Sequence, residues 1–143
     1  MISVGKKKVG KKNIKYIPMG AVPGYVGVCL TKKAFKKELR RLRVSDDLAF
    51  ISRSASATTH CFERKDELVS ILMCLPKKKP NNDDLSYLGI IVHEASHVVD
   101  YLIDGMGEEA PGGEFRAYTI QYVFQSIVAA ISDMKTYHGS KIY

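Results

Sequence analysis

The sequence contains no apolar run approaching the roughly 20 residues that a bilayer-spanning helix needs, so nothing predicts a membrane segment. The lysine-bearing residues 1–8 are not followed by an apolar stretch and cleavage site, which argues against a secretory signal. Cysteine is scarce: Cys29, Cys61 and Cys74 lie in apolar contexts and form no C-x-x-C pair. Reduced, buried thiols and a cytoplasmic location are therefore expected.

Acidic residues are sparse in the first part of the chain. Residues 1–80 hold 19 of the 22 Lys and Arg residues but 6 of the 15 Asp and Glu residues, whereas residues 81–143 are acidic. The Lys/Arg-rich stretch over 6–43 suggests a partner of opposite charge, either nucleic acid or an acidic protein. No recognised nucleic-acid-binding motif accompanies it. The simpler interpretation of these cations is a solvated surface.

The chain length and composition indicate one soluble globular domain. The 143 residues are 45% hydrophobic and 26% charged, which suffices for a sizeable core. Residues 1–15, rich in Lys and Gly, are predicted to form a basic flexible segment, followed by a single domain over 16–143.

Periodicity, propensity and capping residues predict three strands and three helices in this domain. The expected strands cover 25–30, 57–63 and 68–75, and the expected helices cover about 32–43, 85–104 and 114–137. Thr31 and either Asp83 or Asp84 are suitable N-caps. The last two strands flank a short turn and are predicted to form an antiparallel hairpin. The fold class is therefore expected to be α+β, with a small antiparallel or mixed sheet packed on the two long helices.

One pentad, at residues 93–97, reads His-Glu-x-x-His within the helix predicted over 85–104. Residues four apart share a helix face, so His93 and His97 can bind one metal ion. Glu94 stands beside them, where a carboxylate can activate a metal-bound water. A purely structural Zn²⁺ site would not require that glutamate, so the pentad predicts a catalytic zinc site.

A catalytic zinc ion takes three protein ligands, so the chain must supply one more. The metzincin spacing fails, because its third-ligand and glycine positions are Ile103 and Asp100. Four acidic residues are the candidates: Asp104, Glu108, Glu109 and Glu114. Asp104 is off register on a continuing helix. Glu114 is favoured because it opens the next helix, where the small Ala117 permits a close approach.

The final helix also carries a polar stripe at helical spacing. The stripe consists of Glu114, Tyr118, Gln121 and Gln125. Facing another helix that has its own polar stripe, these groups would be buried without partners unless they met a metal or each other. This pattern supports Glu114 as the third ligand and leaves Glu108 and Glu109 as alternatives.

The His-Glu-x-x-His pentad followed by a glutamate on a separate helix resembles the gluzincin family of zinc metallopeptidases. The segment Glu114-Phe115-Arg116-Ala117-Tyr118 is similar to the Glu-x-x-Ala segment of aminopeptidase-like gluzincins. The resemblance covers about residues 83–125 and extends to small zincin-like proteins of phages and bacteria. If the chain is phage-encoded, its compartment would be the host cytoplasm.

The resemblance implies a zinc-dependent peptidase with a zincin-like fold. Zn²⁺ would be held by His93, His97 and Glu114, with Glu94 as general base. Tyr118 would stabilise the oxyanion, and Asp100 would accept a hydrogen bond from the outer nitrogen of a ligand histidine.

The expected substrate is a peptide or protein, which would pair with the strand over 57–63 or 68–75. The alternative is a binding protein on a zincin scaffold, using its basic N-terminal half to bind nucleic acid or an acidic partner.

Overall fold

The computed structural model describes residues 13–66, 68–79, 81 and 83–134. Within them the elements are, in chain order, β1 (Ile14–Ile17), β2 (Tyr25–Cys29), α1 (Lys32–Arg41), β3 (Thr58–Glu63), β4 (Val69–Cys74), α2 (Asp84–Gly105) and α3 (Gly113–Asp133). The α+β class is confirmed. Residues 1–12 of the predicted basic segment lie outside the described part of the chain.

The helices begin at the capping residues that the sequence indicates. Thr31 Oγ1 accepts a hydrogen bond from the Ala34 amide at 3.2 Å and starts α1. The Asp83 carboxylate accepts one from the Leu85 amide at 3.1 Å and starts α2. α3 ends at Asp133, before the predicted end at 137, and residues 135–137 lie outside the described part.

The strands form one mixed sheet in the order β1-β2-β4-β3. β3 and β4 pair antiparallel, with Phe62 opposite Ser70, which confirms the predicted hairpin. β2 runs parallel to β4, and β1 pairs antiparallel with β2. β1 was not anticipated, and it begins at Ile14, inside the segment expected to be flexible. The sheet edges are therefore β1 and β3.

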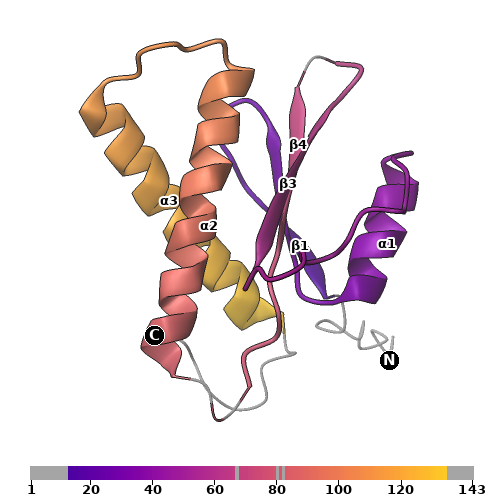
Figure 1. The fold of residues 1–143 in the computed structure, drawn as a ribbon. Helices are drawn as coiled ribbons and strands as arrows, with labels where there is room; N and C mark the ends of the chain where they lie inside the picture. Colours follow the sequence, from indigo (N-terminus) through magenta and orange to yellow (C-terminus); the bar gives the residue numbers. More distant parts are fainter. Residues whose placement is uncertain (1–12, 67, 80, 82, 135–143) are drawn as a thin grey trace, which may run out of the picture.

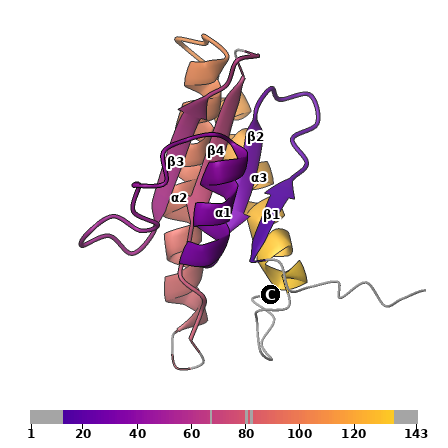
Figure 2. The ribbon, with the colours of Figure 1, turned by 90° about the vertical axis from the view of Figure 1, so that its right-hand side faces the viewer.

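The elements form three layers, with α2 and α3 on one face of the sheet and α1 on the other (Figures 1 and 2). Alternate side chains of each central strand serve opposite faces. Val26, Val28, Ile71 and Met73 pack toward α2 and α3. Cys29, Leu72 and Cys74 pack against Phe35 and Leu39 of α1. None of the helices in the described ranges has the length and apolarity needed to cross a lipid bilayer.

The three cysteines are free thiols, as expected, but Cys61 is only partly buried, whereas all three were expected to be buried. Cys29 and Cys74 are buried opposite each other on β2 and β4. Burial, followed by the hydrogen bond with Cys29, raises the pKa of the Cys74 thiol far above its usual range. Cys74 is therefore protonated at physiological pH and acts as a small apolar core residue.

The contact of α2 with the sheet yields a stability prediction. Leu102 is fully buried in the core, whereas Leu85 on the same helix is 74% exposed. We expect Leu102→Ala to lower the free energy of unfolding by about 2–5 kcal/mol, because it removes buried methyl groups and leaves a cavity. Leu85→Ala, the matched control, should change it by less than about 0.5 kcal/mol. Urea denaturation measures both, and equal losses would contradict the assigned orientation of α2.

Candidate metal centre

The histidine pair lies on the side of α2 that faces away from the sheet. Ile91, Val98 and Leu102 of this helix are fully buried in the core. His93 and His97 are exposed. The core contacts therefore fix the rotation of α2 about its axis, and this rotation directs both imidazoles to solvent.

The two imidazoles converge on one point. His93 Nε2 and His97 Nε2 lie 3.3 Å apart, and their ring planes are inclined at 75°. Two nitrogens bound to one tetrahedral zinc ion at about 2.0–2.1 Å are separated by roughly 3.3 Å. The pair thus has the separation that zinc ligation requires.

Glu94 projects from the flank of α2 toward the edge of the sheet. Its side chain is buried, with 6% of the residue exposed. Thr59 Oγ1 on β3 donates a hydrogen bond to Glu94 Oε2 at 2.5 Å. A buried carboxylate needs such a donor, because burial without one costs several kcal/mol. Thr59 thereby holds one carboxylate oxygen of Glu94.

Thr59 is not among the site residues predicted from the sequence. Its alternation with Cys61 along the strand indicates that both face the same helix layer, but no local pattern says which residue of α2 it meets. Thr59 and Glu94 are 35 positions apart in the sequence.

Asp100 contacts a residue other than a histidine. Its carboxylate accepts a hydrogen bond from Arg116 Nη2 on α3, and the two form an ion pair between half-exposed side chains. The predicted hydrogen bond from a ligand histidine to Asp100 is not among the contacts of the described residues. The ion pair with Arg116 joins the start of α3 to α2 one turn beyond His97.

The favoured third ligand, Glu114, lies in the first turn of α3 and is exposed. Asp104, Glu108 and Glu109 are exposed as well. Tyr118 is 66% exposed. Within the described ranges, no three His, Cys, Asp or Glu side chains come close enough to hold a metal ion. Two of the three predicted ligands are thus brought together, and Glu114 as the third stays a prediction.

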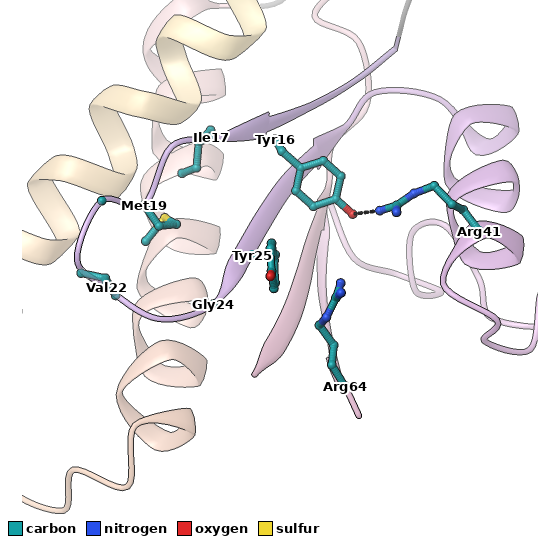
Figure 3. A pocket seen from close by; sticks show the side chains of 9 residues that line it. Tyr16, Ile17, Met19, Val22, Gly24, Tyr25, Arg41 and Arg64 are labelled. Atoms are coloured by element: carbon teal, nitrogen blue, oxygen red, sulfur yellow. Dashed lines mark hydrogen bonds between the residues drawn. The ribbon is translucent and has the colours of Figure 1, made fainter. Parts of the chain in front are cut away.

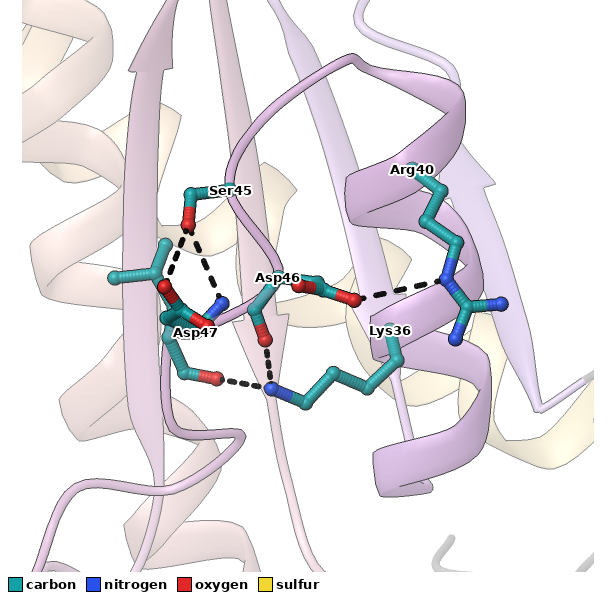
Figure 4. Close-up of polar contacts among 6 residues, drawn as sticks. Lys36, Arg40, Ser45, Asp46 and Asp47 are labelled. Atoms are coloured by element: carbon teal, nitrogen blue, oxygen red, sulfur yellow. Dashed lines mark hydrogen bonds and ion pairs between the residues drawn. The ribbon is translucent and has the colours of Figure 1, made fainter.

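Two cations on the basic face of α1, Lys36 and Arg40, contact the loop that follows the helix (Figure 4). Lys36 Nζ donates to the backbone carbonyl of Leu48 at 2.9 Å and to that of Asp46. Arg40 forms a long ion pair with Asp46 at 3.8 Å. These two cations hold the loop that follows α1. Three exposed or half-exposed lysines of α1 have no such contact with the described residues: Lys32, Lys33 and Lys37.

The chain matches no protein-family model, no curated protein and no solved structure. The resemblance to gluzincins therefore depends on the motif residues alone. Support for a function has to come from the geometry of the side chains.

The contact between Thr59 and Glu94 yields the next prediction. Thr59→Val keeps the shape of the side chain but removes the hydroxyl, so the buried carboxylate loses its donor. The expected loss in the free energy of unfolding is about 1–3 kcal/mol by chemical denaturation at neutral pH. Thr59→Ser, which keeps the hydroxyl, should retain most of this stability. Equal stability of Thr59→Val and wild type would show that the hydrogen bond does not hold Glu94.

Proposed function

We propose that the protein is a zinc-dependent hydrolase of the gluzincin type that cleaves peptide bonds. The observation that carries the proposal is the 3.3 Å separation of the His93 and His97 Nε2 atoms on an exposed helix face. A buried glutamate lies between them in sequence, held on the sheet side of the helix by Thr59. This combination supports two of the three protein ligands and the base that metal-assisted hydrolysis needs.

The chain's own residues have distinct roles in this proposal. His93 and His97 bind zinc through Nε2, and Glu114 completes the ligand set. Zinc held by these residues would supply Lewis acidity for activating a water and a substrate carbonyl. Glu94 accepts the proton of the attacking water and later donates it to the leaving amine. Thr59 occupies Glu94 Oε2, which leaves Oε1 for the proton.

Tyr118 and Asp100 have supporting roles, the first at the substrate oxyanion and the second in the packing of α3 on α2. Tyr118 is 66% exposed on α3, and its phenol is free to turn toward a developing oxyanion. Asp100, through its ion pair with Arg116, holds α3 beside α2. This contact keeps the helix that carries Glu114 and Tyr118 near the histidine pair.

The position of β3 supports a peptide as substrate. β3 is an edge strand, so one side of its backbone has no neighbouring strand within the part of the chain that the structure describes. Its Thr59 contacts Glu94, which places this edge beside the proposed base. An extended peptide can add to such an edge through main-chain hydrogen bonds, which brings its carbonyl groups near Glu94.

Zinc binding tests the ligand assignment. We expect about one zinc ion per chain in protein purified with zinc and desalted, measured by elemental analysis. His97→Ala should abolish stoichiometric binding, since two ligands hold zinc far more weakly than three. Glu114→Gln should weaken it strongly, whereas Glu108→Gln and Glu109→Gln are matched controls that should retain it. Undiminished zinc in His97→Ala would refute the site, and loss in a control instead of Glu114→Gln would reassign the third ligand.

Glu94→Gln tests the chemistry separately from the metal. The variant is nearly isosteric and should keep zinc, but it cannot accept a proton. We expect peptide hydrolysis to fall by about 10²–10⁴-fold, the usual contribution of a general base. The measurement uses a quenched-fluorescent peptide library with zinc-loaded wild type, with Glu109→Gln as the activity control. Hydrolysis by Glu94→Gln at the wild-type rate would remove Glu94 from this role.

A further inference from the structure

A second group of chemically active side chains lies on the opposite face of the sheet, where α1 packs. α1 covers the end of this face that carries Cys29, Leu72 and Cys74. The other end carries Tyr25, which is 39% exposed, and Ser70. There arginine and tyrosine side chains, rather than a helix, lie over the strands (Figure 3).

Arg41, in the last turn of α1, is held in place by two partners. Its Nε donates to Glu38 Oε1 at 2.6 Å, and its guanidinium lies 5.8 Å from the centre of the Tyr16 ring. Tyr16 donates its hydroxyl proton to the same Glu38 oxygen at 2.8 Å. The Tyr16 ring lies across Gly27, where an added Cβ would come within 3.2 Å of it. Arg41 Nη2 donates to the Tyr16 hydroxyl at 3.4 Å (Figure 3), whereas Nη1 has no partner among the described residues.

Arg64, which follows β3, reaches the same region from the other side. Its guanidinium stacks on Tyr25 at 4.2 Å from the ring centre, and Nη1 donates to Ser70 Oγ at 3.3 Å. Its Nε is buried and has no hydrogen-bond partner among the residues that the structure describes. The carboxylate of Asp66 forms a long ion pair with this Nε at 3.5 Å. A buried charged donor without a partner is costly, and an acceptor at this place would relieve that cost.

Two adjoining cavities meet at these arginines. One, of about 390 Å³, is lined by both arginines and by Tyr16, Tyr25 and apolar side chains that include Met19 and Val22. The other, of about 430 Å³, is again lined by Arg41 and Arg64, and also by Arg43 and Lys65. Glu63 is the acidic residue in the lining of the second cavity, and the first has none. Arg41 and Arg64 also pair with Glu38 and Asp66, so the excess of positive charge at the combined site comes from Arg43 and Lys65, which exceed Glu63 by one charge.

We propose that Arg41 and Arg64 bind the phosphate group of a small phosphate monoester in these cavities. Guanidinium groups from two directions suit a tetrahedral dianion, and each has a donor without a hydrogen-bond partner among the described residues, Arg41 Nη1 and Arg64 Nε. Arg43 and Lys65 add positive charge that favours a dianion over a carboxylate. The apolar wall with Met19, Val22 and the Tyr25 ring receives the organic part of the ester. The site is independent of the histidine pair, which lies on the far side of the sheet.

The Nε–Hε signal of Arg64 in ¹⁵N-correlated NMR spectra reports on this site directly. The signal is assigned by its loss in Arg64→Gln, and the probes are phenyl phosphate, inorganic phosphate and benzoate at low ionic strength. We expect a saturable shift with phenyl phosphate, a weaker one with inorganic phosphate and none with benzoate. Tighter binding of inorganic phosphate than of phenyl phosphate would contradict the monoester and identify inorganic phosphate as the ligand of the site. No shift with either phosphate, or an equal response to benzoate, would overturn the proposal.

Single-residue variants distinguish phosphate binding at this site from nonspecific attraction by positive charge. Arg41→Gln and Arg64→Gln should each weaken phenyl phosphate binding at least about tenfold, as expected when a charge-assisted hydrogen bond is lost. Arg64→Lys keeps the charge but loses the planar guanidinium, so it should also weaken phenyl phosphate binding. The control Arg53→Gln, in an exposed loop, removes one charge and should leave the affinity unchanged. Equal weakening by Arg53→Gln, or wild-type affinity in Arg64→Lys, would show nonspecific attraction.

The histidine pair provides a further control for the phosphate titrations. His97→Ala should retain phenyl phosphate binding, because His97 and Arg64 lie on opposite faces of the sheet. Loss of binding in His97→Ala would place the anion at the metal centre and overturn the proposal. Because the titrations need no hydrolysis, their result does not depend on the proposed peptidase activity.

Discussion

The structure depends on the one-sided burial of α2 against the sheet. Ile91, Val98 and Leu102 are fully buried there, and each contributes about 1.5–3 kcal/mol relative to an exposed position. The opposite side of the helix carries the exposed residues His93, His97 and Asp100, which are polar and would be costly to bury against the sheet. The core therefore directs His93 and His97 to solvent before any metal binds. Such preorganisation lowers the cost of assembling a metal site.

Glu94 occupies the boundary between this buried side and the exposed histidines. Its position on the helix directs the carboxylate toward β3, where Thr59 receives it. A carboxylate in the middle of the core would be too costly to ionise, and one in open water would be poorly positioned. At the flank of the helix, one oxygen is held and the other is left for proton transfer. Stability and the proposed chemistry thus require the same hydrogen bond.

Local patterns predicted the helices and the hairpin well, because apolar spacing and caps such as Thr31 and Asp83 lie within a few residues of what they determine. β1 was missed because the four residues Ile14–Ile17 become a strand only by pairing with β2. Thr59 and Arg116 were missed for a related reason. Their partners are distant in sequence, and side-chain contacts between elements follow from packing angles that periodicity does not encode.

The position of the third zinc ligand likewise depends on packing between helices, which local sequence patterns do not determine. The polar stripe on α3 was expected to be buried against the stripe of α2, but its four residues are exposed, and Glu114 lies in the first turn of the helix. Whether its carboxylate reaches the histidines depends on how the loop between Gly105 and Gly113 lets the two helices approach. The contact between Arg116 and Asp100 brings α3 alongside α2 just beyond His97. Sequence spacing predicts Glu114 as the ligand, but the packing of α2 and α3 sets the distance between its carboxylate and the histidines.

The two faces of the sheet differ because their helices differ in length. α2 and α3 have 22 and 21 residues, while α1 has 10 and is only about 15 Å long. The uncovered strand surface is filled by Tyr16 and two arginines. Glu38, with 8% of the residue exposed, needs both Tyr16 and Arg41, since a buried carboxylate that loses a partner is strongly destabilising. The fold therefore fixes Arg41 for its own stability, and an arginine already fixed loses little entropy when it binds an anion.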